Sequence, residues 1–229
     1  VFPRSLIATQ PGVTLSAEQG TRRLWDIYDP YLKEEYEAVK VLGIWVMSPT
    51  VLMTRSHAVR VVPDLQGMKV RISSPVESQL IQTWGGVPVA MGQGGAYEAL
   101  QKGVVDATFA PIETLKGWKQ AEVVKSTTNT RDIGYTTCMF VVMNKKKWEG
   151  LPADIKNIFT EVSQEWIAVQ GEVWDKADEE GLAFTRELGN EIIELSPEQN
   201  AKWVAAVKPV LNEYSEDMKK KGLPGEQAV

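Results

Sequence analysis

One histidine and one cysteine occur in the 229 residues of this sequence, and their scarcity excludes several kinds of site. A single cysteine cannot form an internal disulfide, and the two residues cannot supply the four nitrogen and sulfur ligands of a structural zinc site. The sequence also lacks the motifs of nucleophile elbows, metalloprotease helices, calcium loops, P-loops and dinucleotide-binding turns. We therefore expect no cofactor, no metal and no catalytic apparatus.

Positive charge is not in excess, because the net charge is −5. Nothing in the charge balance favours nucleic acid or an anionic membrane as a partner. No apolar run approaches the length of a transmembrane helix. The chain begins at Val1 instead of methionine and shows no signal peptide, so we expect a processed chain or a fragment.

Strand and helix periodicities alternate along the chain and predict an α/β fold. Strand patterns occupy residues 39–47, 50–60, 68–72, 104–110, 135–143 and 192–195. Helical patterns begin after Ser16 and occupy residues 75–84, 97–102, 112–124 and 197–218. We expect the strand at 135–143 to be central, Cys138 to be a buried packing residue, and the lysines at 145–147 to form a turn.

The longest helical pattern begins at Pro152. Its apolar residues fall three or four apart and predict one buried face, formed by Ile155, Ile158, Val162, Trp166, Val169, Val173 and Ala177. A helix of about 35 residues is about 50 Å long, which exceeds one small domain, so we expect it to bridge two lobes. The acidic cluster at 178–180 is interpreted as a solvated face.

The segment at residues 64–77 has the strongest signal for binding. Lys69 and Arg71 alternate with apolar residues as in a strand, and Ser74, followed by proline and then Glu77, predicts a capped helix start. An arginine at a strand end beside a helix N-terminus suits a carboxylate or phosphate. The alternative is an arginine that is only solvated or paired with a surface acid.

Three blocks of this sequence resemble the solute-binding proteins of tripartite ATP-independent periplasmic (TRAP) transporters, the DctP-like family. They are residues 64–71, 97–106 and 151–155. The resemblance implies a two-lobed periplasmic-binding-protein-like fold that closes on its ligand, with a long bridging helix. Lobe I would hold 1–52 plus 134–172, and lobe II 53–133 plus 173–229. Roughly the first quarter to third of a typical member is missing, so lobe I should lack its N-terminal part and central strands.

The resemblance also implies a function. The protein would bind a small organic acid in the periplasm, act as a monomer and deliver the acid to the membrane permease subunits. Arg71 would pair with the carboxylate, and His57 occupies the region of a second basic partner. Many members have asparagine where Ala110 stands, and Phe109 precedes it, which favours an aromatic or branched acid over a sugar acid.

Phe109, Trp45 and Trp118 would pack on the apolar part of the acid. Two other functions remain open at this point. A ligand-sensing domain would use the same closing lobes. An enzyme acting on organic acids would use Arg71 as the anchor and His57 or a buried carboxylate as the base.

Overall fold

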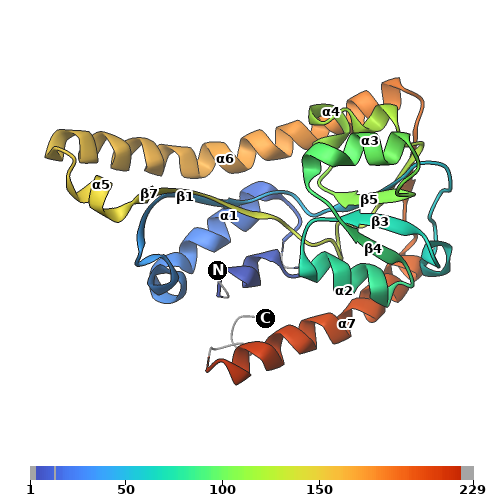
Figure 1. Ribbon diagram of the computed structural model, residues 1–229, viewed down its shortest axis with the longest axis horizontal. Helices are drawn as coiled ribbons and strands as arrows, with labels where there is room; N and C mark the ends of the chain where they lie inside the picture. Colours follow the sequence, from blue (N-terminus) through green and yellow to red (C-terminus); the bar gives the residue numbers. More distant parts are fainter. Residues whose placement is uncertain (1–3, 13, 223–229) are drawn as a thin grey trace.

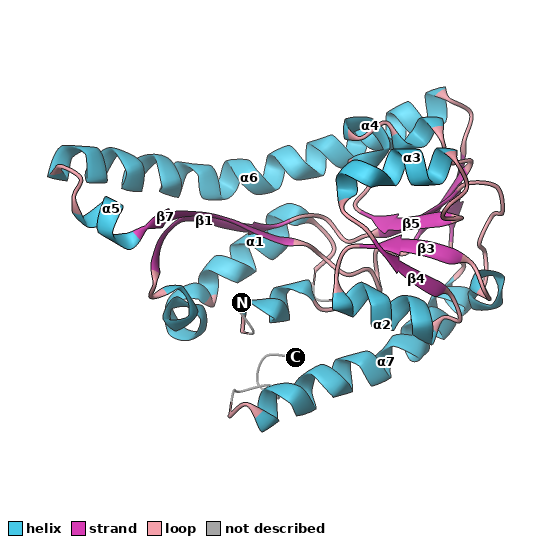
Figure 2. Cartoon of the chain, in the orientation of Figure 1, coloured by secondary structure: helices cyan, strands magenta, loops and turns pink. Residues whose placement is uncertain are grey.

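The computed structural model of the protein describes residues 4–12 and 14–222. These residues form an elongated molecule in which a long helix runs beside two separate sheets (Figures 1 and 2). The strands are β1 (Val39–Val46), β2 (Val51–Thr54), β3 (Lys69–Ile72), β4 (Val87–Ala90), β5 (Ala107–Ala110), β6 (Ser126–Asn129), β7 (Cys138–Asn144) and β8 (Glu191–Glu194). The α/β fold expected from the sequence is confirmed.

The helices connect these strands. They are α1 (Ala17–Asp26), α2 (Pro75–Thr83), α3 (Ala96–Gln101), α4 (Thr114–Gly117), α5 (Lys145–Glu149), α6 (Ala153–Glu187) and α7 (Pro197–Lys220). Short turns of 3-10 helix are η1 (Ser5–Thr9), η3 (Lys33–Tyr36), η4 (Val62–Leu65), η5 (Gln93–Gly95) and η6 (Gln120–Glu122), and η2 (Tyr28–Leu32) is a π-helical turn. The predicted helix at 112–124 is therefore only two short turns, α4 and η6.

The larger sheet has six strands in the order β4-β3-β5-β2-β6-β8. Helices α2 and α7 cover one face, where Trp84, Trp203 and Phe109 form part of the core. Helices α3 and α4 and the end of α6 cover the other face, around Met53 and Leu115. Strand β6 has the polar sequence Ser-Thr-Thr-Asn, so no apolar pattern predicted it.

The smaller sheet contains only β1 and β7, paired antiparallel. Helix α1 packs against it, and Leu24 and Ile44 belong to its core. The prediction that residues 135–143 form a central strand is wrong, because β7 pairs only with β1 among the described residues. No described strand pairs with its other edge, and Cys138 is only partly buried.

Helix α6 has 35 residues, as the sequence predicted, and it runs along both sheets. The predicted buried face is wrong. Ile158, Val162, Trp166, Val169 and Val173 are between 37% and 55% exposed. The buried residues of α6 are instead Gly171, Asp178, Gly181 and Thr185, because the helix approaches its neighbours most closely along this small and polar face. Asp178 is thus not a solvated residue.

The chain crosses between the two sheets three times. The first two crossings, at 47–50 and 130–137, lie side by side, since the Met47 N–H donates to the Thr137 carbonyl and the Thr50 N–H to the Tyr135 carbonyl, both at 2.9 Å. The third crossing is α6, and the Ser48 hydroxyl joins it to the first by donating to Asp175 at 3.1 Å.

Candidate functional site

Arg71 is the third of the four residues of β3, and α2 begins four residues later. The predicted capping box is confirmed. The Ser74 hydroxyl accepts a hydrogen bond from the Glu77 N–H at 3.2 Å, and a Glu77 oxygen accepts one from the Ser74 N–H at 3.0 Å. The same oxygen accepts hydrogen bonds from the N–H and hydroxyl of Ser73. This local network fixes the turn that joins Arg71 to the helix N-terminus.

The guanidinium group of Arg71 is buried, but few protein groups offset the loss of its hydration. The side chain is 3% exposed, and its Nε donates to the Met91 carbonyl at 3.0 Å. Within the described residues, no carboxylate lies within 4.0 Å of it as an ion-pair partner. Burial lowers the pKa of Arg71, and the charge of Glu77 opposes that shift. A buried cation that lacks an ion pair favours binding of an anion from solution.

Glu77 itself does not fill that role. It is 1% exposed, and one of its oxygens already accepts hydrogen bonds from Ser73 and Ser74. Burial raises the pKa of Glu77, while the hydrogen bonds from Ser73 lower it. The Glu77 carboxylate therefore holds the start of α2. The two terminal guanidinium nitrogens of Arg71 make no hydrogen bond within the described part of the chain.

Strand register decides which side chains share a face with Arg71. In the parallel pairing of β3 with β5, Arg71 lies opposite Thr108, so these two side chains point to the same face. Ala110 lies on that face too, two residues nearer the carboxyl end of β5. Phe109 points to the opposite face, where it is fully buried and contacts the ring of Trp84 at a centroid distance of 5.7 Å.

The structure does not bring His57 to Arg71. Strand β2 runs antiparallel to β5, so the end of β2 lies beside the start of β5. His57, three residues after Thr54, therefore lies toward the amino ends of β3 and β5, away from their carboxyl ends. Its side chain is exposed. A second basic partner for the same carboxylate is therefore not supplied by His57 in this arrangement.

Neither of the two tryptophans predicted from the sequence lies on β3 or β5. Trp118 follows α4 and is 47% exposed. Trp45 lies on β1 and lines a cavity of about 230 Å³ between the small sheet and α6, together with Val141 and Trp166. Of the six predicted residues, only Arg71 and Ala110 lie on the same face of the sheet near the carboxyl ends of β3 and β5.

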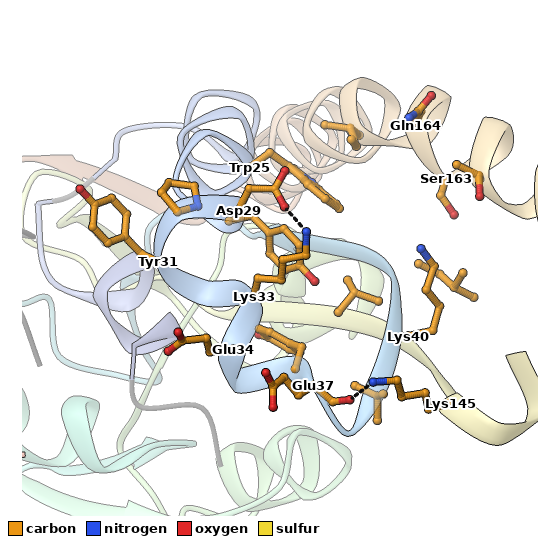
Figure 3. Close-up of a pocket in the computed structure, with 18 residues that line it drawn as sticks. Trp25, Asp29, Tyr31, Lys33, Glu34, Glu37, Lys40, Lys145, Ser163 and Gln164 are labelled. Carbon is orange, nitrogen blue, oxygen red and sulfur yellow. Dashed lines mark hydrogen bonds and ion pairs between the residues drawn. The ribbon is translucent and has the colours of Figure 1, made fainter. Parts of the chain in front are cut away.

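A larger cavity of about 700 Å³ lies beside the small sheet, and nothing in the sequence pointed to it (Figure 3). It is formed by η2, η3, β1 and α6. Two of its lysines already have partners, since Lys33 pairs with Asp29 at 2.9 Å and Lys145 donates to the Glu37 carbonyl at 3.0 Å. Lys40 lies 4.8 Å from the ring centre of Trp148. The cavity thus has no unpaired cation comparable to Arg71 among these three lysines.

The described residues form neither a metal site nor a membrane-spanning helix. No group of three or more His, Cys, Asp or Glu side chains there is placed to hold a metal ion. None of the helices formed by residues 4–12 and 14–222 combines the length and apolar character needed to span a membrane.

Known proteins are similar to this chain in sequence and in fold. The profile of the family described as bacterial extracellular solute-binding protein, family 7 (DctP), matches residues 17–217. A C4-dicarboxylate-binding periplasmic protein DctP from Rhodobacter capsulatus is 32% identical over 169 residues, which are 72% of this chain and 50% of that protein. The chain spans about half the length of the curated relatives it matches.

Solved structures give the same result. A TRAP periplasmic solute-binding protein from Desulfovibrio salexigens is 29% identical with a TM-score of 0.85, covering 99% of this chain and 70% of its own. A marine metagenome TRAP solute-binding protein, specific for aromatic acids and complexed with 3-hydroxybenzoate, is 26% identical with a TM-score of 0.91, covering 99% and 72%. These relatives are solute-binding proteins of transport systems, not enzymes. With 201 of its 229 residues matched by the family profile, the chain belongs to family 7 of the bacterial extracellular solute-binding proteins.

Proposed function

We propose that this chain is the ligand-binding part of a periplasmic TRAP transporter subunit that binds a small organic acid through Arg71. The observation that carries the proposal is the buried guanidinium group of Arg71, which has one hydrogen bond to a carbonyl and no carboxylate in ion-pair range among the described residues. A carboxylate bound to the two outer nitrogens would restore both charge balance and hydrogen bonding.

The proposal includes the movement of two lobes. Lobe I consists of 1–52 plus 134–172, and lobe II of 53–133 plus 173–229. The lobes close on the acid, and the monomeric protein delivers it to the membrane permease subunits. In support, the two sheets are separate, and three crossings run between them in the part of the chain that the structure describes.

We further infer that the ligand is an aromatic or branched monocarboxylate. Of the two basic residues predicted from the sequence, only Arg71 lies toward the carboxyl ends of β3 and β5, because His57 follows the opposite end of the antiparallel strand β2. The segment that follows β5 is apolar and buried, from Ala110 through Ile112. A relative with 26% identity binds 3-hydroxybenzoate. The second carboxylate of a dicarboxylate would not reach His57, which lies at the other end of the strands.

A thermal-shift and calorimetric screen tests this function. The panel contains benzoate, 3-hydroxybenzoate, succinate and galacturonate. A ligand at about 100 times its Kd raises the melting temperature of a protein of this size by about 5–10 °C. We expect the aromatic acids to bind and Arg71→Ala to raise Kd by about 10- to 150-fold, the range for one lost charge-assisted hydrogen bond.

Arg60→Ala is the matched control, because Arg60 is an exposed arginine that pairs with Glu191 elsewhere on the same sheet. It should leave Kd unchanged. Stronger binding of succinate than of benzoate would overturn the ligand class. Unchanged binding in Arg71→Ala would overturn the site, and no binding of any acid would contradict the function proposed for this chain.

A further inference from the structure

The loop between β4 and α3 starts beside Arg71. Strand β4 runs parallel to β3 and pairs Ala90 with Ile72, so the residues that follow β4 lie at the carboxyl ends of both strands. The Met91 N–H donates to the Ile72 carbonyl at 3.1 Å, and the Met91 carbonyl accepts the hydrogen bond from the Arg71 Nε at 3.0 Å. These two hydrogen bonds hold the start of the loop against the guanidinium group.

Gln93 has the single polar side chain of residues 91–95, which read Met-Gly-Gln-Gly-Gly. It follows Met91 by two residues and stands between two glycines. A Cβ added at Gly92 or at Gly94 would meet no atom within 4 Å, so the backbone on both sides of Gln93 is not packed. The loop therefore presents one amide group, next to the residue that holds Arg71.

The amide nitrogen of Gln93 is buried, although the residue as a whole is partly exposed. The nitrogen therefore points inward from the loop surface. It makes no hydrogen bond within the described residues. A buried N–H donor without an acceptor is unfavourable, and an acceptor that arrives with a ligand removes that cost.

The chemistry of the two side chains divides the acid between them. The two terminal nitrogens of Arg71 suit a carboxylate, because the guanidinium fork forms two parallel hydrogen bonds with the two carboxylate oxygens. The amide of Gln93 is neutral and suits a hydroxyl or carbonyl oxygen. On a small acid held by its carboxylate, the nearest place for such an oxygen is the carbon next to the carboxylate.

We propose that Gln93 is a specificity-determining residue that donates a hydrogen bond to an oxygen on the carbon next to the carboxylate. The chain then prefers 2-hydroxy and 2-oxo acids among the aromatic and branched monocarboxylates. This inference rests on the proposed binding of the carboxylate by Arg71. An acid that lacks the oxygen leaves the buried amide nitrogen without an acceptor and binds more weakly.

Calorimetry with mandelate and phenylacetate on the 229-residue chain tests the role of Gln93. The two acids differ only in the hydroxyl group on the carbon next to the carboxylate. We expect mandelate to bind about 2- to 13-fold more tightly, the range for one neutral hydrogen bond. Gln93→Met keeps the length of the side chain and removes the donor. It should abolish the preference by weakening mandelate binding while phenylacetate binding stays within about twofold of the wild type.

Gln93→Glu tests the distance to the carboxylate independently of the hydroxyl group. A glutamate here places a negative charge beside the bound acid, so both acids should bind about tenfold or more weakly. Unchanged phenylacetate binding in this variant would show that Gln93 lies far from the carboxylate, and it would overturn the inference. Melting temperatures of both variants show whether they fold.

Gln120→Met is the matched control. Gln120 is fully buried, and its amide has no hydrogen-bond partner within the described residues. It lies ahead of β6, which runs parallel to β5 because both are antiparallel to β2, so Gln120 is toward the amino ends of these strands. Its replacement should keep the preference for mandelate. Loss of the preference in Gln120→Met as well would show general loosening and would overturn the specific role of Gln93.

The same titrations separate this inference from the proposed function. Binding of both acids with equal Kd, or a preference for mandelate that survives in Gln93→Met, would overturn the role of Gln93 and leave the carboxylate site at Arg71 intact. Binding of neither acid by the wild-type chain would contradict the proposed function and this inference together.

Discussion

Asp175 and Asp178 lie three residues apart on α6, yet they accept backbone hydrogen bonds from opposite parts of the molecule, Asp175 from the start of α1 and Asp178 from the turn before α4. One helical turn therefore carries both attachments. The carboxylates buried at this turn, the guanidinium group of Arg71 and the two faces of α6 lead to the predictions that follow.

Stability should increase as the pH falls from 8 to 5. The pKa of Glu113 rises from its usual 4.5 to about 7 in the folded protein, so the folded state binds the proton more tightly than the unfolded chain. Stability is then lost as the pH rises through about 7. Asp178, raised from 3.8 to about 6, acts in the same direction at lower pH. Melting temperatures measured across this range check the prediction.

Glu113→Gln removes the upper part of this dependence, so its melting curve should change less between pH 6 and 8 than that of the wild type. Glu179→Gln, an exposed site on α6, should keep the wild-type slope. A wild-type melting temperature that is flat or rises with pH across this range would contradict the burial of these two carboxylates.

Replacing Arg71 with methionine should stabilise the unliganded protein. The side chain is 3% exposed and lacks a carboxylate partner in the described residues, whereas methionine has a similar volume and no charge to desolvate. We expect a gain of about 1 kcal/mol, which is about 2–4 °C in Tm. Arg60→Met, at an exposed ion pair, should change stability by no more than about 0.5 kcal/mol. A large loss of stability in Arg71→Met would show that Arg71 is mainly structural.

Gly181→Ala should destabilise the protein although alanine is the better helix former. The new Cβ would meet the Ile112 carbonyl oxygen at 2.6 Å. Overpacking of this kind costs about 1–3 kcal/mol, which exceeds the propensity gain of about 1 kcal/mol. Gly94→Ala is the control, because no atom lies within 4 Å of the added Cβ. Urea unfolding measures both, and equal stability of the two variants would contradict the close packing of α6.

The exposed apolar face of α6 should bind a hydrophobic dye. Trp166 is 50% exposed and Val162 45% exposed, and they lie on one side of the helix. Contiguous apolar surface of this kind binds such dyes and partners. We expect 8-anilinonaphthalene-1-sulfonate fluorescence with the native chain and a reduced signal in Trp166→Glu. Glu165→Gln, at the neighbouring exposed position, should keep the signal, and a signal unaffected by Trp166→Glu would place the dye elsewhere.

Local features were readable from the sequence because their causes are local. Ser74, Pro75 and Glu77 form their capping box within four residues, so the start of α2 and the position of Arg71 at a strand end follow from adjacent residues. The helical period of α6 is also local, since its apolar residues recur three or four apart from Ile155 to Ala177 within the 35-residue helix. These features need no information about distant parts of the chain.

The tertiary structure alone decided which of these residues meet. The apolar stripe of α6 shows a helical period but not its partner, and the face that packs is the one with Gly171, Asp178 and Gly181, because only small side chains allow that close approach. Strand β5 pairs with β2 and β3, which lie far from it in the sequence. This pairing places His57 at the opposite end of the strands from the carboxyl ends of β3 and β5, and it places Phe109 on the sheet face opposite Arg71. The sequence by itself determined the α/β class, the capped turn and the arginine at a strand end. Strand register and helix contacts depend on long-range pairing, and they decided the surroundings of Arg71 and the face of α6 that packs.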